Sequence, residues 1–347
     1  MDKRELLRKT GSFQQLASVR TLSFAEGRAQ TRAVELVNGP LRFTALADKC
    51  LDVAELSYRG VNFSFLSKPG LQGRNQYDTN GDEALRSIMG GLFFTAGLEN
   101  ICAPCTIEGK DYPMHGRIRT TPAEHLCADA HWEGEDYVLE ISGEMREAEL
   151  FGENLVLRRT LRSIYGEKSF TLTDEIENQG FRDEPLMLLY HINIGYPLLD
   201  EGTRLYLPTR KVTPREELSA PHAERWNVMD APKDNEPEYV FIHDPIADKS
   251  GVVRACVVNE KLSLGLMISY DTANLPYFME WKSTASGDYV LGLEPANSSV
   301  YGRPFHEKRE DLHRLAPFAK ETNKIRFTVL DGAEEIAAAV AAIQALR

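Results

Sequence analysis

The chain has 347 residues, of which 42% are hydrophobic and 27% are charged, a composition typical of folded globular proteins and not of disordered ones. Its formal net charge of −12 argues against a nucleic acid or an anionic membrane as partner, because both require a basic protein face. No apolar run is long enough to span a bilayer and the first residues lack the apolar segment of a secretory signal, so we expect a cytoplasmic protein.

The five cysteines are scattered along the chain, and their odd number fits reduced thiols in the cytoplasm. Cys102 and Cys105 form a C-x-x-C pair, but no helical pattern follows it, as a thioredoxin-like redox motif would require. A second pair at zinc spacing is also missing. We therefore interpret the cysteines as buried or idle thiols.

The first part of the chain changes from a helical to a strand pattern. Residues 2–17 are amphipathic and predict a short helix within a helical lead-in over residues 1–20. Alternating residues then predict strands over 32–37 and 41–46, and short strands punctuated by glycine and asparagine are typical of a β-sandwich or barrel. Residues 67–89 are polar, glycine-rich and too long for a hairpin loop, which leaves open whether they form a lid over a ligand.

The rest of the chain continues the same pattern. Residues 124–181 predict an antiparallel meander, and residues 208–238, rich in proline and charge, predict an excursion because similar strands resume after it. The alanine-rich segment 333–347 predicts a C-terminal helix. Neither βαβ alternation nor a G-x-G-x-x-G sequence supports a dinucleotide-binding fold. We predict a mainly β, single-domain protein over residues 1–347.

Two apolar strands end in polar residues, which is how a strand delivers polar groups to the rim of a cavity. In one of them, His191 and Asn193 are two residues apart and therefore share a face. In the other, Glu294 follows an apolar run, where burial would raise its pKa toward the range of a general base. The structural alternatives are a core histidine bonded to a backbone carbonyl and a surface glutamate in a turn.

A third stretch places His115 before Gly116, whose backbone could approach a ligand closely, and before Arg117, which suits oxygen-rich ligands. A surface-loop histidine is an equally good interpretation of this stretch alone. We predict that His115, His191 and Glu294 meet over one ligand.

Two other chemistries are weaker interpretations of the same residues. Two histidines and a glutamate could bind zinc or iron, but they are far apart in sequence and no closely spaced histidine pair anchors a metal. A serine hydrolase is weaker still, because the G-x-S-x-G sequence is absent. We therefore predict no metal and no cofactor.

In their order and spacing, four motifs resemble the aldose 1-epimerase (galactose mutarotase-like) superfamily, and more closely its poorly characterised branch of mutarotase-like proteins. The motifs are Pro113–Arg117, Leu189–Asn193, Tyr196–Leu199 and Leu293–Asn297. The resemblance spans roughly residues 20–330. It implies a β-supersandwich, in which two large antiparallel sheets pack face to face and the ligand lies in a groove over one of them.

The resemblance also implies a cofactor-independent isomerase. In mutarotases a glutamate takes the proton of the anomeric hydroxyl and a histidine protonates the ring oxygen, so that the ring opens and closes again on the other face. This implies Glu294 as base, His191 as acid and His115 as a second histidine that binds the sugar. The residues expected to bind the substrate are Arg117, Asn193, Glu280, Lys282 and Asn297.

The sequence also departs from the pattern of the family. The arginine expected before the first histidine is missing from Gly97–Ile101, and His115 is followed by glycine and arginine instead of two glycines. Arg117 and Lys282 could bind a carboxylate or phosphate. The expected ligand is therefore a neutral, acidic or phosphorylated sugar. A homodimer is a possible assembly of the chain. The alternative functions are a non-catalytic carbohydrate-binding protein and a metal-dependent sugar isomerase.

Overall fold

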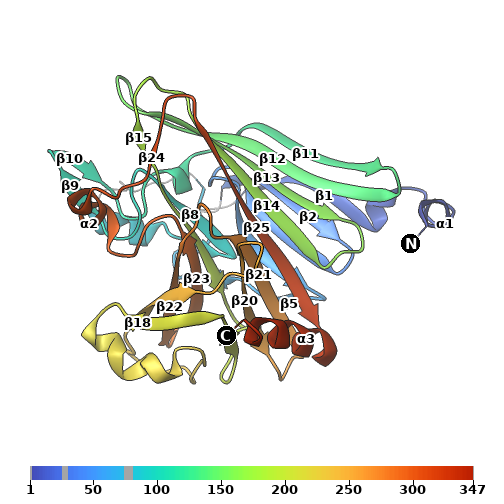
Figure 1. Ribbon diagram of the computed structural model, residues 1–347. Helices are drawn as coiled ribbons and strands as arrows, with labels where there is room; N and C mark the ends of the chain where they lie inside the picture. Colours follow the sequence, from blue (N-terminus) through green and yellow to red (C-terminus); the bar gives the residue numbers. More distant parts are fainter. Residues whose placement is uncertain (1, 26–29, 74–80, 347) are drawn as a thin grey trace.

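The computed structural model describes residues 2–25, 30–73 and 81–346, and it consists mainly of large antiparallel sheets (Figure 1). The five-stranded sheet has the order β1 (Ala17–Phe24), β2 (Thr31–Asn38), β3 (Leu41–Leu46), β4 (Asp52–Tyr58) and β5 (Val61–Asn62). The eight-stranded sheet has the order β11 (Glu124–Glu133), β12 (Asp136–Ala148), β13 (Asn154–Ile164), β14 (Ser169–Asn178), β25 (Lys320–Asp331), β21 (Leu264–Asp271), β20 (Val252–Asn259) and β17 (Arg204–Tyr206). The six-stranded sheet has the order β18 (Thr209–Pro214), β19 (Tyr239–Pro245), β22 (Tyr277–Ala285), β23 (Asp288–Ala296), β16 (Met187–Ile194) and β8 (Phe93–Leu98). The predicted mainly β fold is confirmed.

The remaining elements are short. The two-stranded ribbons are β6 (Phe65–Leu66) with β7 (Gly90–Gly91), β9 (Cys105–Ile107) with β10 (Lys110–Tyr112), and β15 (Glu184–Pro185) with β24 (Arg314–Leu315). The helices are α1 (Lys3–Leu7), α2 (Gly302–Arg309) and α3 (Ala333–Gln344), with 3₁₀ turns η1 (Phe13–Gln15), η3 (Gly81–Arg86), η4 (Ile118–Thr120) and η5 (Glu217–Arg225). Within the described part of the chain, none of the helices has the length and apolar character needed to cross a bilayer.

Two predicted segments differ from the structure. In the lead-in, only α1 and the short 3₁₀ turn η1 are helical, and β1 already begins at Ala17, because Val19 and Thr21 are β-branched and pair with β2. The excursion over residues 208–238 contains β18, which adds an edge strand to the six-stranded sheet. Of the predicted segment 67–89, residues 74–80 lie outside the described residues. The single domain, the homodimer and the cytoplasmic location stay predictions.

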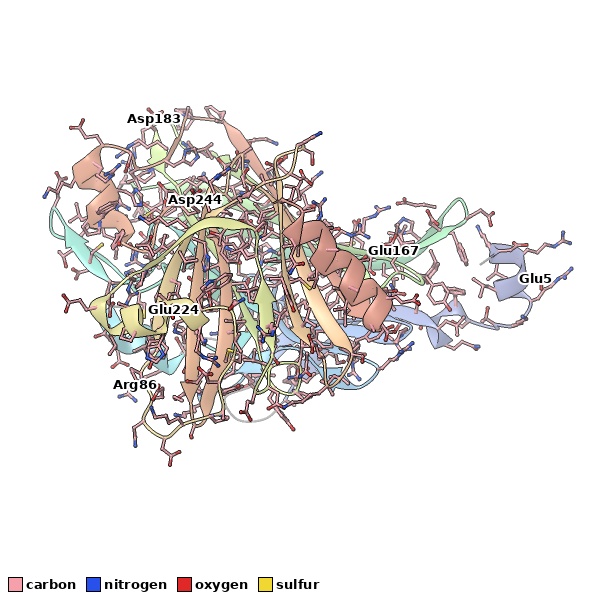
Figure 2. All side chains as sticks on the ribbon, turned by 60° about the horizontal axis from the view of Figure 1, so that its bottom comes forward. Glu5, Arg86, Glu167, Asp183, Glu224 and Asp244 are labelled. Atoms are coloured by element: carbon pink, nitrogen blue, oxygen red, sulfur yellow. The ribbon has the colours of Figure 1, made fainter. Side chains whose placement is uncertain are left out.

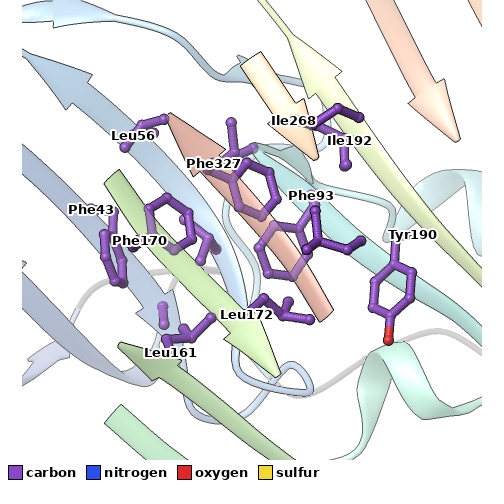
Figure 3. Packing of buried hydrophobic residues seen from close by; sticks show 14 of the residues in the cluster. Phe43, Leu56, Phe93, Leu161, Phe170, Leu172, Tyr190, Ile192, Ile268 and Phe327 are labelled. Atoms are coloured by element: carbon purple, nitrogen blue, oxygen red, sulfur yellow. The ribbon is translucent and has the colours of Figure 1, made fainter. Parts of the chain in front are cut away.

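The main hydrophobic core lies where the three large sheets meet. Phe43 of β3 packs on Phe170 of β14 with ring centroids 4.5 Å apart, and Phe170 stacks on Phe327 of β25 at 4.6 Å. Phe93 of β8 extends the row at 5.7 Å from Phe327 (Figure 3). Each such ring pair contributes about 0.5–1.5 kcal/mol beyond the burial of its area, so this row fixes the sheets against one another.

The central strands of the six-stranded sheet are buried on both faces. In β16, Leu188, Tyr190 and Ile192 point into the main core, and His191 and Asn193 occupy the opposite face, since side chains alternate along a strand. That opposite face also carries a second hydrophobic cluster, with Phe94, Met187 and Met279 among its residues. The polar residues of the predicted site therefore lie on the face of the sheet that points away from the main core.

Charge is concentrated on the outside of the molecule. Glu5, Arg86 and Asp183 are exposed and lie at its periphery in Figure 2. The helix α3 covers the outer face of the eight-stranded sheet, where Ile343 packs with Cys256 of β20 and Leu330 of β25. In Figure 1, α2 and the β9–β10 ribbon lie together on the side opposite α1.

Candidate functional site

A cavity of about 650 Å³ lies over the outer face of the six-stranded sheet, and His115, His191 and Glu294 all line it. His191 belongs to β16 and Glu294 to β23, which are neighbours in the sheet. His115 comes from the segment between β10 and η4, and its ring lies 5.6 Å from that of His191, centroid to centroid. The structure thus brings the three residues together from distant parts of the sequence.

Aromatic side chains fix the ring of His191. Phe94, opposite His191 on β8, stacks on it with centroids 4.5 Å apart, and Trp281 of β22 meets it edge-on at 5.3 Å. The ring Nδ1 lies 2.6 Å from Oδ1 of Asn193. Burial lowers the pKa of His191 to about 4, and the bond to Asn193 opposes this shift only in part.

Glu294 forms a buried pair with this histidine. Its Oε1 lies 3.1 Å from Nε2 of His191. Burial, and to a lesser extent the charge of Glu238, raise the pKa of Glu294 to about 8, while the charge of Arg215 opposes the rise. Gly292 makes room for the pair, because a Cβ there would stand 3.0 Å from the Cβ of Trp281 and 3.2 Å from Oε1 of Glu294. A carboxyl group with this pKa can exchange protons near neutral pH.

His115 is held by its own backbone surroundings. Its φ is +58°, in the left-handed region, and its Nδ1 accepts a hydrogen bond from the backbone N–H of Cys102 at 3.3 Å. The next residue, Gly116, has φ +67° and packs so closely on the chain that a Cβ would lie 2.0 Å from the carbonyl oxygen of Gly97. The glycine after this histidine is therefore required by packing.

Of the five predicted substrate-binding residues, only Asn193 lines the cavity. Glu280 and Lys282 flank Trp281 on β22, and because side chains alternate, Trp281 faces the cavity and its two neighbours face the opposite side. There Glu280 lies 3.1 Å from Nε2 of His243, and Lys282 donates to backbone carbonyls of residues 225 and 228. The prediction that these two residues contact the ligand does not fit the structure.

The other two predicted binding residues also have structural partners elsewhere. Asn297 accepts a hydrogen bond from the N–H of Leu188 at 2.7 Å and donates to the carbonyl of Leu186 at 2.8 Å, so it fastens β16 to the end of β23. Arg117 pairs with Glu99 and donates to the carbonyl of Asp111 at 3.1 Å. Neither residue lines the cavity, where the ligand was expected.

We expect Lys282 to contribute to stability. In Lys282→Met the carbonyls of residues 225 and 228 lose their donor, which costs about 1–3 kcal/mol for a buried acceptor left unsatisfied. Urea unfolding measures the loss, with the exposed lysine variant Lys324→Met as a control expected to stay within about 0.5 kcal/mol. Equal midpoints for both variants would contradict this role of Lys282.

Several cavity residues were not predicted from the sequence. Phe94 and Trp281 flank His191, and Arg215 and Glu238 lie in or beside the charged excursion before β19. Nε1 of Trp281 donates to Oε2 of Glu238 at 2.8 Å. Alternation along β22 would have predicted Trp281 only if the cavity-facing side of that strand had been known. Arg215 and Glu238 reach the cavity because of the course of a loop, which the sequence does not predict.

A group of metal-binding residues forms elsewhere. Among the described residues, the one cluster with ligand atoms close enough to share an ion is Glu124, His125 and Glu144, at the edge of the eight-stranded sheet. Both Glu124 and His125 are exposed, and exposed acidic groups of this kind are common without a metal. The cavity residues do not form such a cluster.

Comparison with known proteins gives a family and a fold. Residues 28–329 match the family described as "Domain of unknown function (DUF4432)". No curated protein matches the chain.

Solved structures share the fold over nearly the whole chain. A provisionally named aldose 1-epimerase from Klebsiella pneumoniae has a TM-score of 0.90 at 24% identity, covering 100% of this chain and 91% of that one. A galactose mutarotase-like protein from Clostridium acetobutylicum has a TM-score of 0.61 at 11% identity, with coverages of 91% and 99%. A galactose 1-epimerase from Lactobacillus acidophilus has a TM-score of 0.57 at 13% identity, with coverages of 91% and 100%. The galactose mutarotase-like fold expected from the sequence motifs is confirmed.

Proposed function

The chain belongs to the family described as "Domain of unknown function (DUF4432)", and from this premise we propose that it is a cofactor-independent aldose 1-epimerase. The observation that carries the proposal is the buried pair of Glu294 and His191, 3.1 Å apart, with His115 beside it in one cavity. The fold shared with proteins named as epimerases and mutarotases supports it. Anomer interconversion needs one group to remove a proton and another to supply one, and these side chains meet that requirement.

In the proposed reaction Glu294 accepts the proton of the anomeric hydroxyl while a histidine protonates the ring oxygen. The bond between the anomeric carbon and the ring oxygen breaks, the carbonyl group turns, and the ring closes from its other face. Trp281 and Phe94 supply apolar surface beside these polar groups, a combination typical of small-molecule sites. Each proton-transfer group contributes typically about 10²–10⁴-fold to the rate.

The charges of the cavity favour a neutral sugar. Among the described residues, Lys68 and Arg215 are the cations that line it, and both are paired with carboxylates. Nζ of Lys68 lies 2.5 Å from Asp288, and Nε of Arg215 lies 2.7 Å from Glu216. Arg117 and Lys282, the residues considered for an acidic or phosphorylated sugar, point elsewhere. An anionic substrate would therefore compete with carboxylates already bound to both cations.

Saturation-transfer NMR of anomer exchange tests the proposal with the unmodified protein. The panel contains neutral aldoses, deoxy sugars, uronic acids and sugar phosphates, each measured with and without protein. We expect faster exchange for at least one neutral sugar and none for the phosphates. A sugar that raises the melting temperature without faster exchange would instead indicate a carbohydrate-binding protein.

A further inference from the structure

The two histidines of the cavity differ in which ring nitrogen is free. Nδ1 of His191 lies 2.6 Å from Oδ1 of Asn193, and an amide oxygen can only accept, so Nδ1 carries the proton of the neutral ring. The orientation of this amide is set by its Nδ2, which donates to the carbonyls of His191 at 2.8 Å and Gly90 at 3.4 Å. Nε2 of His191 therefore bears a lone pair, and it faces Oε1 of Glu294.

His115 has the opposite arrangement. Its Nδ1 accepts from the N–H of Cys102, so a neutral ring carries its proton on Nε2. Its own backbone N–H donates back to the carbonyl of Cys102 at 3.0 Å, which fixes the ring relative to this segment. Within the described part of the chain, no side chain or carbonyl accepts a hydrogen bond from Nε2, and the partly exposed ring lines the cavity.

We propose that His115, and not His191, donates the proton to the ring oxygen, and that His191 is a positioning residue that holds Glu294. The inference rests on the proposed epimerase function. In the opening step Nε2–H of His115 protonates the ring oxygen as its bond to the anomeric carbon breaks, and Glu294 takes the hydroxyl proton. Ring closure reverses both transfers, so no further reactant is needed. A neutral imidazole is a weak acid, but the ring oxygen becomes a strongly basic alkoxide as its bond to the anomeric carbon breaks. A neutral histidine can therefore act as the hydrogen-bond and proton donor to it.

The charged and titratable surroundings are compatible with these roles. Burial and the neighbouring His191 and Arg119 keep the pKa of His115 well below its usual range, so its ring stays neutral. Glu294 faces His191, Arg215, Glu238 and the thiol of Cys102, whose pKa is raised by burial so that it stays uncharged. Between about pH 4 and about pH 8, the Glu294–His191 pair therefore holds one proton, and above that range it holds none.

The pH dependence of kcat/KM distinguishes the two donors, since each requires a different state of the pair. If His115 is the donor, the active state has ionised Glu294 and a neutral His191, so kcat/KM rises about tenfold between pH 7 and pH 9 and stays high. If His191 were the donor, the pair would need its one proton, and kcat/KM would fall about tenfold over the same interval. The uncatalysed exchange rate is subtracted at each pH, and the falling profile would overturn the proposal.

Nitrogen-15 NMR of the histidine rings tests the same inference without a substrate. The resting protein is expected to carry the ring proton of His115 on Nε2 and that of His191 on Nδ1. In Asn193→Leu the Nδ1 proton of His191 loses its acceptor, so the signal that changes in this variant is assigned to His191. A proton on Nδ1 of His115 would overturn the proposal. Because this measurement does not depend on turnover, it separates the placement of the protons from a failure of the epimerase function itself.

Discussion

Glu294→Gln is expected to lower the rate of anomer exchange by about 10²–10⁴-fold with little change in stability. Glutamine has the shape of glutamate, and its amide can still donate to Nε2 of His191, so the buried contact persists. However, the amide cannot accept the proton of the anomeric hydroxyl. Saturation-transfer NMR measures the exchange rate, and thermal unfolding shows whether the fold is retained.

The chain contains a matched control for this variant. Glu280 and His243 form a second buried glutamate–histidine pair, also 3.1 Å apart, on the face of β22 that points away from the cavity. In Glu280→Gln the same atoms are exchanged at similar burial, and we expect the exchange rate to stay within about twofold, a threshold well below the contribution of a proton-transfer group. Equal losses in the two variants would show that the effect of Glu294→Gln comes from the sheet and not from the site.

The sequence predicted the site residues that lie at the ends of apolar strands. His191 and Asn193 share a face because they are two residues apart, and Glu294 follows a run of apolar residues. The predicted functions of these residues stay predictions, but their positions around one cavity follow from motifs that the sequence shows directly.

The sequence could not show which way β22 faces. Residues 278–284 are buried on both sides of the strand except for the partly exposed Trp281, so hydrophobic alternation is absent there. Glu280 and Lys282 therefore looked as suitable for a ligand as Trp281, and only the pairing of β22 with β19 and β23 separates them. Arg215 and Glu238 could not be predicted as cavity residues for another reason: a proline-rich excursion has no periodicity from which its course could be inferred.

A buried charged cluster behind the site was equally hidden in the sequence. Arg158 and Arg159 are neighbours on β13, but Arg158 is partly exposed and Arg159 is completely buried. All five N–H groups of the Arg159 guanidinium have acceptors. These are both carboxylate oxygens of Asp174, Oδ1 of Asp52, the carbonyl of Cys50 and the hydroxyl of Thr95.

This cluster joins the eight-stranded sheet to the strands that carry the site. The hydroxyl of Tyr190, the residue before His191, donates to Asp174 at 2.9 Å. Thr95, the residue after Phe94, donates to Asp52 through both its backbone N–H at 3.0 Å and its hydroxyl at 2.7 Å. Because side chains alternate along β16 and β8, these inward contacts fix the backbone from which His191 and Phe94 reach the cavity.

Arg159→Leu is expected to lower the free energy of unfolding by about 3–5 kcal/mol, the cost of leaving buried carboxylates without their partner. Burial already raises the pKa of Asp52 to about 6 with the arginine present. Without the arginine, the folded-state pKa of Asp52 rises further above its unfolded value, so the destabilisation grows as pH increases and shrinks as this carboxylate becomes protonated. Urea unfolding at pH 5 and pH 8 should therefore show the larger loss at pH 8.

The neighbouring arginine provides the control for this variant. Arg158→Leu makes the same change on the same strand, but its partners Glu144, Glu175 and Glu177 are reached by water, and exposed pairs contribute about 0–1 kcal/mol. A loss in Arg159→Leu no larger than in Arg158→Leu would contradict the role of the cluster. If the cluster also positions the site, Arg159→Leu should slow anomer exchange under conditions in which both variants remain folded. The reason is that Asp52 and Asp174, which bind Thr95 and Tyr190, would no longer be held in place, so β8 and β16 would be less firmly fixed.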